Sequence, residues 1–216
     1  APAFDTAVSL VVGSSGASLP TAATIVPGKA AAPAEYSYDS VTLGKVVITD
    51  GATVDTIKTV SVDGYGATSS INSNALTDVT LKHSSGDMTV TSTVASLNLT
   101  VDDIQNDVTL TAGSLKTLNL TTTGVASDFN LAAIAVETLN ITANADLDIT
   151  DSFKFVTTTN ETVLKTVTIS GTGDVALGDI SATATALTST TTGDVSAQVD
   201  GTKATVTTGA GNDTIT

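Results

Sequence analysis

Apolar residues recur along this chain in the spacing apolar-x-x-apolar-x-apolar, in segments that begin about 20 residues apart. Six segments share this spacing: IKTVSV at 57–62, LTDVTL at 76–81, VASLNL at 94–99, LKTLNL at 115–120, VETLNI at 136–141 and LKTVTI at 164–169. Their last residues alternate, as Leu118 and Leu120 do around Asn119. This alternation predicts β-strands with one buried and one solvent-exposed face.

A second short alternating segment follows each of the last five segments and begins with Asp. These second segments are DMTV at 87–90, DVTL at 107–110, DFNL at 128–131, DLDI at 146–149 and DVAL at 174–177, with DVSA at 194–197 as a degraded copy. One such unit cannot bury its apolar faces alone, whereas stacked units share a continuous core. The sequence therefore predicts an all-β fold: a right-handed parallel β-solenoid of roughly eight coils, with two short strands per coil of about 20 residues.

The N-terminal 40 residues have a different pattern. Phe4–Val12 alternates like a strand, residues 13–38 are rich in Gly, Ala, Ser and Pro, and all four prolines precede Thr42. We predict an N-terminal strand and an extended connector or cap over 1–40, and the solenoid over 41–216. The wider interval between the segments that begin at 136 and 164 predicts an insertion near 152–161.

Composition limits the partners that such a solenoid can bind. Hydrophobic residues make up 41% and aromatic residues 3% of the 216 residues, so the core must consist of small aliphatic side chains. The net charge is −14, and all eight basic residues are Lys. Without Arg the chain lacks bidentate donors for phosphate, so we expect no nucleic acid partner and repulsion from anionic membranes. The 22 acidic residues instead attract divalent cations.

Residue types needed for several other chemistries are missing. Cysteine is absent, which removes disulfides and thiolate metal sites. The apolar run Val8–Val12 is too short to span a bilayer, so we expect no direct membrane insertion. His83 is the only histidine and is expected at the surface; alone, it supplies neither a zinc site nor a catalytic triad. We therefore predict that the chain is not an enzyme.

The aspartates that begin the second segments are the first candidate for binding chemistry. They are Asp87, Asp107, Asp128, Asp146, Asp174 and Asp194. Stacked in one ladder at coil spacing, neighbouring carboxylates would repel by roughly 1 kcal/mol in water. Two interpretations offset that repulsion: each carboxylate accepts backbone N–H bonds in an Asx turn, or Ca²⁺ bridges adjacent coils. Further candidate ligands in the second interpretation are Asp102, Asp103, Asp148, Asp151 and Asp179.

The last nine residues, 208–216, resemble the calcium-binding nonapeptide of RTX proteins, G-G-x-G-x-D-x-U-x. Gly209, Gly211, Asp213 and Ile215 match this pattern, and Thr208 departs from it where the first Gly belongs. The resemblance implies that Gly209, Gly211 and Asp213 contribute to a calcium site, that Ile215 packs inward, and that the solenoid leads into an RTX-type β-roll turn. In that family the ion lies between successive turns, so one nonapeptide supplies half a site.

As a whole, residues 41–216 resemble the repetitive, Cys-free, Thr-, Ala- and Asp-rich body of Gram-negative RTX-type S-layer proteins, such as the Caulobacter S-layer protein family. The resemblance implies type I secretion, a place on the cell surface, calcium dependence and self-assembly into a lattice. It also implies contact with cell-surface polysaccharide through another part of the chain. The first alternative is a spacer or stalk of a large RTX adhesin. The second is a carbohydrate-active β-helix enzyme, since hydrolases need only paired carboxylates.

Polar side chains should also form ladders on the solvent face of the strands. Asn98, Asn119 and Asn140 occupy equivalent positions and lie in N-x-T sequences. We expect a ladder of hydrogen-bonded amides there and keep glycosylation as the alternative. Outward Thr residues, such as Thr109 and Thr121, suit strands in general; ice binding is the specialised alternative for such an array.

Overall fold

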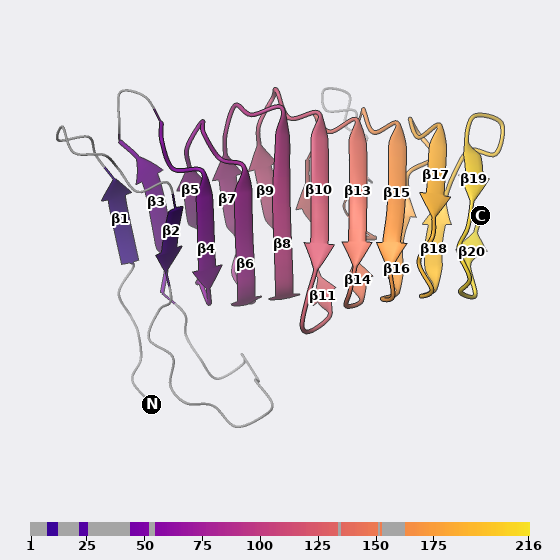
Figure 1. Ribbon diagram of the computed structural model, residues 1–216, viewed down its shortest axis with the longest axis horizontal. Coiled ribbons are helices and arrows are strands. Elements are labelled where there is room, and N and C mark those ends of the chain that lie inside the picture. The colour runs from indigo at the N-terminus through magenta and orange to yellow at the C-terminus, as the bar shows by residue number, and fades with distance from the viewer. Residues whose placement is uncertain are drawn as a thin grey trace.

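The computed structural model describes residues 8–12, 22–25, 44–51, 55–133, 135–150, 152 and 163–216. Within these ranges, β-strands are the only regular secondary structure. They form three sheets whose neighbouring strands are parallel. The chain winds through about eight turns of a parallel β-solenoid (Figure 1), which confirms the predicted all-β fold and is consistent with right-handed winding.

Sheet B, the longest sheet, runs the length of the solenoid and lies nearest the viewer in Figure 1. Its strands are β2 (Ala22–Ile25), β4 (Thr59–Asp63), β6 (Asp78–Ser84), β8 (Ser96–Ile104), β10 (Thr117–Thr122), β13 (Thr138–Ala143), β15 (Thr166–Gly171), β17 (Ala186–Ser189) and β19 (Thr205–Thr207). The six repeated segments of the sequence contribute β4, β6, β8, β10, β13 and β15. The repeat therefore predicted this sheet.

The second strand of a coil belongs to sheet A early in the chain and to sheet C later. Sheet A contains β1 (Val8–Val12), β3 (Val46–Asp50), β5 (Ser69–Asn72), β7 (Met88–Thr91), β9 (Val108–Thr111) and β12 (Leu131–Ala132). Sheet C contains β11 (Ser127–Asp128), β14 (Leu147–Asp148), β16 (Val175–Asp179), β18 (Val195–Gln198) and β20 (Thr214–Ile215). Both sheets meet in one coil, where β11 begins sheet C and β12 ends sheet A. We call the coils before this junction the first half and those after it the second half.

The side chains that point inward form one hydrophobic core. Leu118 and Leu120 are fully buried, whereas Asn119 between them is only partly buried. Most core residues are Val, Leu and Ile, and the described aromatic members are Tyr65 and Phe129. Burial of each large aliphatic side chain contributes roughly 1.5–3 kcal/mol. The predicted alternation of buried and exposed faces is confirmed.

The strand register between two early repeats differs from the prediction by two residues. Matching the segments at 76–81 and 94–99 would pair Leu81 with Leu99. The structure instead pairs Val79 with Leu99, and Leu81 with Val101. An offset of two residues leaves every side chain on the same face of the sheet, so alternation alone cannot detect it.

Strands β1 and β2 lie within the N-terminal 40 residues, β1 in the predicted strand and β2 in the predicted connector or cap. The first pairs with β3 and the second with β4, so they add a coil to the solenoid before residue 41. The strand predicted within Phe4–Val12 is present at Val8–Val12. Apart from Ser152, the insertion predicted near 152–161 lies outside the described residues.

Sheet B strands of the first half end in bends with a left-handed backbone. Gly64, His83, Asp103 and Gly124 have φ of 75°, 51°, 54° and 67°. Strand pairing places these four residues at equivalent positions of successive coils. Glycine adopts this conformation without a steric penalty, and Asp tolerates it better than most residues do. In each of these coils, the bend directs the chain from its strand in sheet B toward the second strand of the same coil.

Candidate functional site

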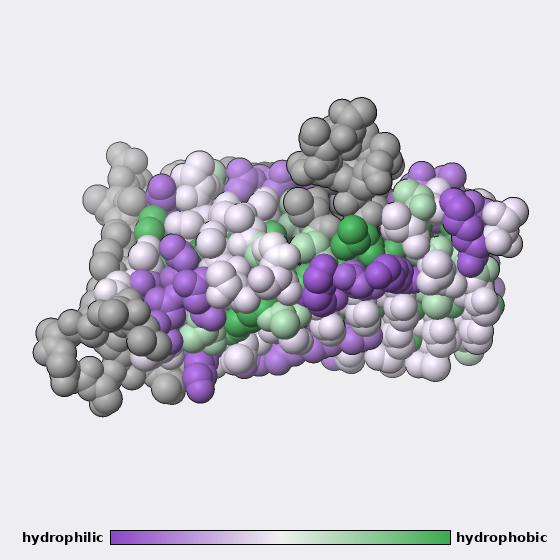
Figure 2. All heavy atoms as spheres, turned by 90° about the horizontal axis from the view of Figure 1, so that it is seen from above, coloured by the Kyte–Doolittle hydropathy of each residue, from purple (hydrophilic) through white to green (hydrophobic). Residues whose placement is uncertain are grey.

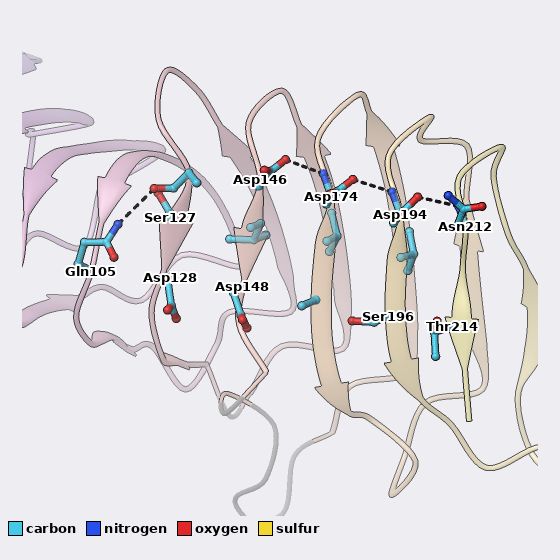
Figure 3. Close-up of a pocket in the computed structure, with 15 residues that line it drawn as sticks. Gln105, Ser127, Asp128, Asp146, Asp148, Asp174, Asp194, Ser196, Asn212 and Thr214 are labelled. Atoms are coloured by element: carbon cyan, nitrogen blue, oxygen red, sulfur yellow. Dashed lines mark hydrogen bonds between the residues drawn. The ribbon is translucent and has the colours of Figure 1, made fainter. Parts of the chain in front are cut away.

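The turns that lead into sheet C place three exposed carboxylates in one row. Asp146, Asp174 and Asp194 occupy successive coils, and Asn212 continues the row (Figure 3). We call these four residues the turn row. The backbone N–H of Asp174 donates to Asp146 Oδ1 at 2.9 Å, that of Asp194 to Asp174 Oδ1 at 2.8 Å, and that of Asn212 to Asp194 Oδ1 at 2.6 Å. Each carboxylate therefore stabilises the coil that follows it.

Glycines allow these turns to stack closely. A Cβ at Gly193 would collide with the backbone carbonyl group of Gly173, and one at Gly211 with that of Gly193. Gly209 lies equally close to the carbonyl oxygen of Thr191. Because backbone atoms cannot move aside as the end of a flexible side chain can, these positions accept only glycine without a shift of the turn. The close approach brings each N–H within reach of the carboxylate on the preceding coil.

A second row, polar except for Ala176, lies on sheet C itself. Asp128 pairs with Asp148, and Ala176, Ser196 and Thr214 continue along the sheet. Together with the turn row, these residues line an open groove of about 440 Å³ (Figure 3). The groove is lined by five Asp and by no aromatic side chain. This concentration of carboxylates attracts cations.

The six aspartates predicted to form one ladder lie in three separate rows, so that prediction is wrong. Asp87 and Asp107 stack over sheet A, and Asn130 continues their row by donating from Nδ2 to Asp107 Oδ1 at 3.0 Å. The pairing of β12 with β9 aligns Asn130, and not Asp128, with Asp107. Asp128 stacks instead with Asp148 in sheet C. The cause is again an offset of two residues, at the junction of sheets A and C.

The nonapeptide-like end of the chain forms the last turn and β20. Ile215 packs against the core, as the motif predicts. Asp213 aligns with Val195, and its Oδ1 accepts a hydrogen bond from the Val195 N–H at 2.9 Å. The Asp213 carboxylate is therefore directed to the preceding coil, one position away from the turn row.

Asn212 is the turn-row residue that the sequence analysis did not single out. Residues 191–194 (TTGD) and 209–212 (GAGN) align without gaps once their glycines at 193 and 211 are matched. That match places Asn212 opposite Asp194, where the structure has it. The neighbouring Asp213 was assigned instead because it matches the Asp of the nonapeptide pattern.

The calcium role predicted for these residues depends on which oxygen atoms can reach one ion. Within the described ranges, no three His, Cys, Asp or Glu side chains form a group that could hold a metal. Ca²⁺ also accepts backbone carbonyl oxygens and water, at about 2.3–2.6 Å. Two oxygens on opposite sides of the ion are then about 5 Å apart, close to the strand spacing of about 4.8 Å. The donor set suits an ion shared by adjacent coils and completed by water.

The predicted amide ladder on sheet B is confirmed. Nδ2 of Asn140 donates to Asn119 Oδ1 at 2.9 Å, Nδ2 of Asn119 to Asn98 Oδ1 at 2.8 Å, and Nδ2 of Asn98 to Asp78 Oδ1 at 2.8 Å. Hydrogen bonds from Thr77 and then Asn98 lower the pKa of Asp78 below its ordinary value. The bonds engage the amide nitrogens that glycosylation would use.

The remaining candidate ligands that the structure describes, Asp102, Asp103 and Asp179, do not line the groove. Asp102 is nearly buried, accepts the Val125 N–H at 2.9 Å and lies 3.5 Å from Lys82 Nζ. Asp179 accepts a backbone N–H two residues further on, in an Asx turn. Asp151 lies outside the described residues. Local hydrogen bonds thus account for the Asp102 and Asp179 carboxylates.

His83 is partly buried, although the sequence analysis placed it at the surface. Its Nδ1 lies 2.7 Å from Asp63 Oδ1 on the neighbouring strand β4. His83 lies at a left-handed bend of the backbone, and neither His83 nor Asp63 lines the groove.

A membrane-spanning helix, or similarity to a known protein, would give further information about function. Within the described ranges, no helix is long and apolar enough to cross a bilayer. Compared with known proteins, the chain matches no family model, no curated protein and no solved structure.

Proposed function

We propose that this chain is a structural segment of a secreted, calcium-dependent bacterial surface layer, which self-assembles into a lattice on the cell surface. The observation that supports this best is the unbroken stack of coils with an acidic turn row repeated along one side. A stack with one continuous core is stiff, because every coil is held by its neighbours. Stiff units with repeated cation-attracting sites suit an ion-stabilised lattice.

Calcium would act on the repulsion within the turn row. Backbone N–H donors offset part of it, since each carboxylate accepts one from the next coil. An ion shared by Asp146 and Asp174, or by Asp174 and Asp194, would offset the rest. Free calcium at 100 times Kd stabilises a folded protein by about 2.7 kcal/mol per site.

The other proposed calcium ligands would act in the same way, with fewer carboxylates. Asp87 with Asp107, and Asp128 with Asp148, are the two further carboxylate pairs on adjacent coils. At the last turn, Gly209, Gly211 and Asp213 would supply carbonyl and carboxylate oxygens to an ion shared with a neighbouring coil. These are weaker candidates for binding than the turn row, because each has a single carboxylate or a single carboxylate pair, whereas the turn row has two overlapping pairs.

The calcium step is tested by thermal unfolding in excess calcium and in chelator, both at raised salt to screen surface repulsion. We expect a higher Tm in calcium. Asp174→Asn should lose much of that response, because Asp174 is central in the turn row. The matched control Asp103→Asn should keep it, because Asp103 lies at a corner of the first half outside the groove. Equal responses of the two variants would remove the turn row from the proposal.

Assembly is tested by electron microscopy of the same preparations. Ordered two-dimensional sheets in calcium and dispersed particles in chelator are expected. Stiff single rods without lateral order would favour the adhesin stalk, for which the same solenoid would serve as a spacer. Disordered particles in both conditions would contradict both structural functions.

The enzyme alternative has one favourable observation, the paired carboxylates of the groove. Its lining contains no aromatic side chain on which a sugar ring could stack, so the groove supports this alternative in one respect only. Release of reducing ends from polysaccharides, lost in an Asp148→Asn variant, would favour the enzyme over the structural function.

A further inference from the structure

A band of outward positions across sheet B, from Ser96 in β8 to Thr207 in β19, holds no charged side chain; the charged residues of these strands, Asp102 and Asp103, lie beyond this band at the end of β8. Those positions hold Ser96, Asn98, Thr100, Thr117, Asn119, Thr121, Thr138, Asn140, Thr142, Thr166, Thr168, Ser170, Ala186, Thr188, Thr205 and Thr207. We call this surface the sheet B face. In a chain with a net charge of −14, so wide an uncharged surface is unusual. Acidic residues instead stand outside sheets A and C, at Asp87, Asp107 and the groove.

Charged side chains also line the edge where the strands of this face begin. Lys116, Glu137 and Lys165 occupy that edge on successive coils. Glu137 lies 2.9 Å from Lys116 Nζ and 2.6 Å from Lys165 Nζ, so the row is largely neutralised internally. Figure 2, the view from above, shows hydrophobic side chains only in small patches between polar ones. This edge therefore offers no extended apolar surface for binding a partner.

The side chains of the sheet B face are ordered in columns. Strand pairing stacks Thr on Thr at 117, 138 and 166, and amide on amide at 98, 119 and 140. The amide column is held by hydrogen bonds of 2.8–2.9 Å. Each of these amides has a second N–H, and each Thr hydroxyl can both donate and accept. The face thus offers regularly spaced hydrogen-bonding groups with methyl groups between them.

We infer that the sheet B face is where a second copy of this chain docks in the lattice, an inference that rests on the proposed function. Two copies that met through their acidic faces would bring like charges together, which costs affinity. On the sheet B face that cost is absent. Its columns repeat at the strand spacing of about 4.8 Å, and a second copy has the same repeat. Identical columns of facing sheets can therefore interdigitate along their whole length, as in steric zippers.

The size of the face predicts a weak contact. Six strands span about 29 Å at strand spacing, and five residues of strand span about 17 Å. The face therefore offers roughly 500 Å² per copy, at the low end of specific interfaces. One such contact should dissociate readily in solution, whereas many contacts in a lattice reinforce one another.

The experiment compares two double variants of the full chain by sedimentation equilibrium in calcium. Thr121→Lys with Thr168→Lys places charges in the middle of the sheet B face, and Thr89→Lys with Thr109→Lys places them on sheet A. We expect the association constant to fall at least tenfold in the first and to stay within twofold of the parent in the second. Both variants become less negative by the same amount, so general repulsion cannot explain a loss. Equal Tm values would show that both fold.

Three results would overturn the inference. If the sheet B variant associates as the parent does, the contact lies elsewhere, while self-assembly itself stands. If the parent stays monomeric with calcium yet forms ordered sheets in the microscope, the lattice uses another contact and the proposed function survives. If the parent is monomeric but is retained on insoluble polysaccharide, and the Thr121→Lys with Thr168→Lys variant is not, the face recognises carbohydrate.

Discussion

The two halves of the solenoid share sheet B but lead the chain to their second strands through different turns. The first half bends at left-handed residues such as His83 and Asp103. In the second half, Gly173 and Gly193 lie against the preceding coil on successive turns; in the first half Gly86 does so, but Asn106 takes its place on the next coil. The acidic residues beside these turns differ accordingly. Asp107 accepts a side-chain amide from the next coil, whereas the carboxylates of the turn row accept backbone N–H groups.

This difference shows how a solenoid can stack like charges. A carboxylate row persists where each member accepts a donor from the following coil, and a backbone donor reaches it only where the turns lie close together. Asn106, and not glycine, precedes Asp107, and the first-half row gives way to Asn130 one coil later. In the second half the glycine column continues, and the carboxylate row continues for three coils.

The largest effect should come from damage to the core that both halves share. Leu118→Asp buries a charge without a partner in the middle of sheet B, which costs roughly 3–5 kcal/mol. Asn119→Asp changes the neighbouring outward residue and loses its bond to Asn98, at a cost of about 1 kcal/mol. Thermal unfolding of both variants measures the difference. Equal losses of Tm would mean that the inward and outward faces have been exchanged.

The second prediction separates the turn of the second half from an ordinary loop. Gly193→Ala forces a Cβ against the Gly173 carbonyl group and should cost about 1–3 kcal/mol. Gly113→Ala, in a first-half loop, is the matched control because a Cβ there meets nothing within 4 Å. Its stability should stay within about 0.5 kcal/mol of the parent. If urea midpoints of the two variants coincide, close backbone approach is not what the glycine column provides.

The repeated alternation of the sequence was sufficient to predict the parallel solenoid, the buried face and the amide ladder, because each depends only on which face a residue occupies. It was not sufficient for strand register. Val79, and not Leu81, pairs with Leu99, and Asn130, and not Asp128, aligns with Asp107. Both errors are of two residues, the offset to which a period of two is blind. Such offsets are set by the geometry of the turns. Because the sequence pattern of a turn is short, it did not reveal them.

The candidate site was predicted in part for the same reason. Asp146, Asp174 and Asp194 form a row as expected, because the Gly-Asp turns before β16 and β18 keep one length. Asp128 falls outside it because the junction coil holds both β11 and β12. Of the two interpretations of the ladder, backbone hydrogen bonding is present, although the N–H comes from the next coil and not from the same turn.

The third prediction tests the donors of the two acidic rows directly. In chelator, Asp174→Ala leaves the Asp194 N–H without its acceptor and should cost about 1 kcal/mol. Asp107→Ala removes an exposed contact with Asn130 and should cost a few tenths of that. Asp174→Asn keeps an acceptor oxygen and removes the charge, so it should be at least as stable as the parent in chelator. A greater loss in Asp107→Ala than in Asp174→Ala would reverse the comparison.

The smallest effect concerns Glu137, which begins the coil after the junction coil and contacts the coils on both sides of it. Its carboxylate contacts Lys116 of the preceding coil and Lys165 of the following one. Hydrogen bonds from Lys165 and Lys116 lower the pKa of Glu137 from 4.5 to about 2. Since the folded pKa lies below the unfolded one, the stability from these pairs is present above about pH 4.5 and is lost as the pH falls toward 2.

The measurement is the Tm of the parent and of Glu137→Gln from pH 7 to pH 2. The parent should melt slightly higher at pH 7, and the gap should close as the pH falls through the window below 4.5. High salt at pH 7 should close it too, because all three side chains are partly exposed. Asp200→Asn is the control, since Asp200 pairs with Lys203 within one loop and joins no coils. A gap for Glu137→Gln that persists at pH 2 and in high salt would mean that Glu137 supports these coils by packing, and that charge does not link the junction coil to the second half.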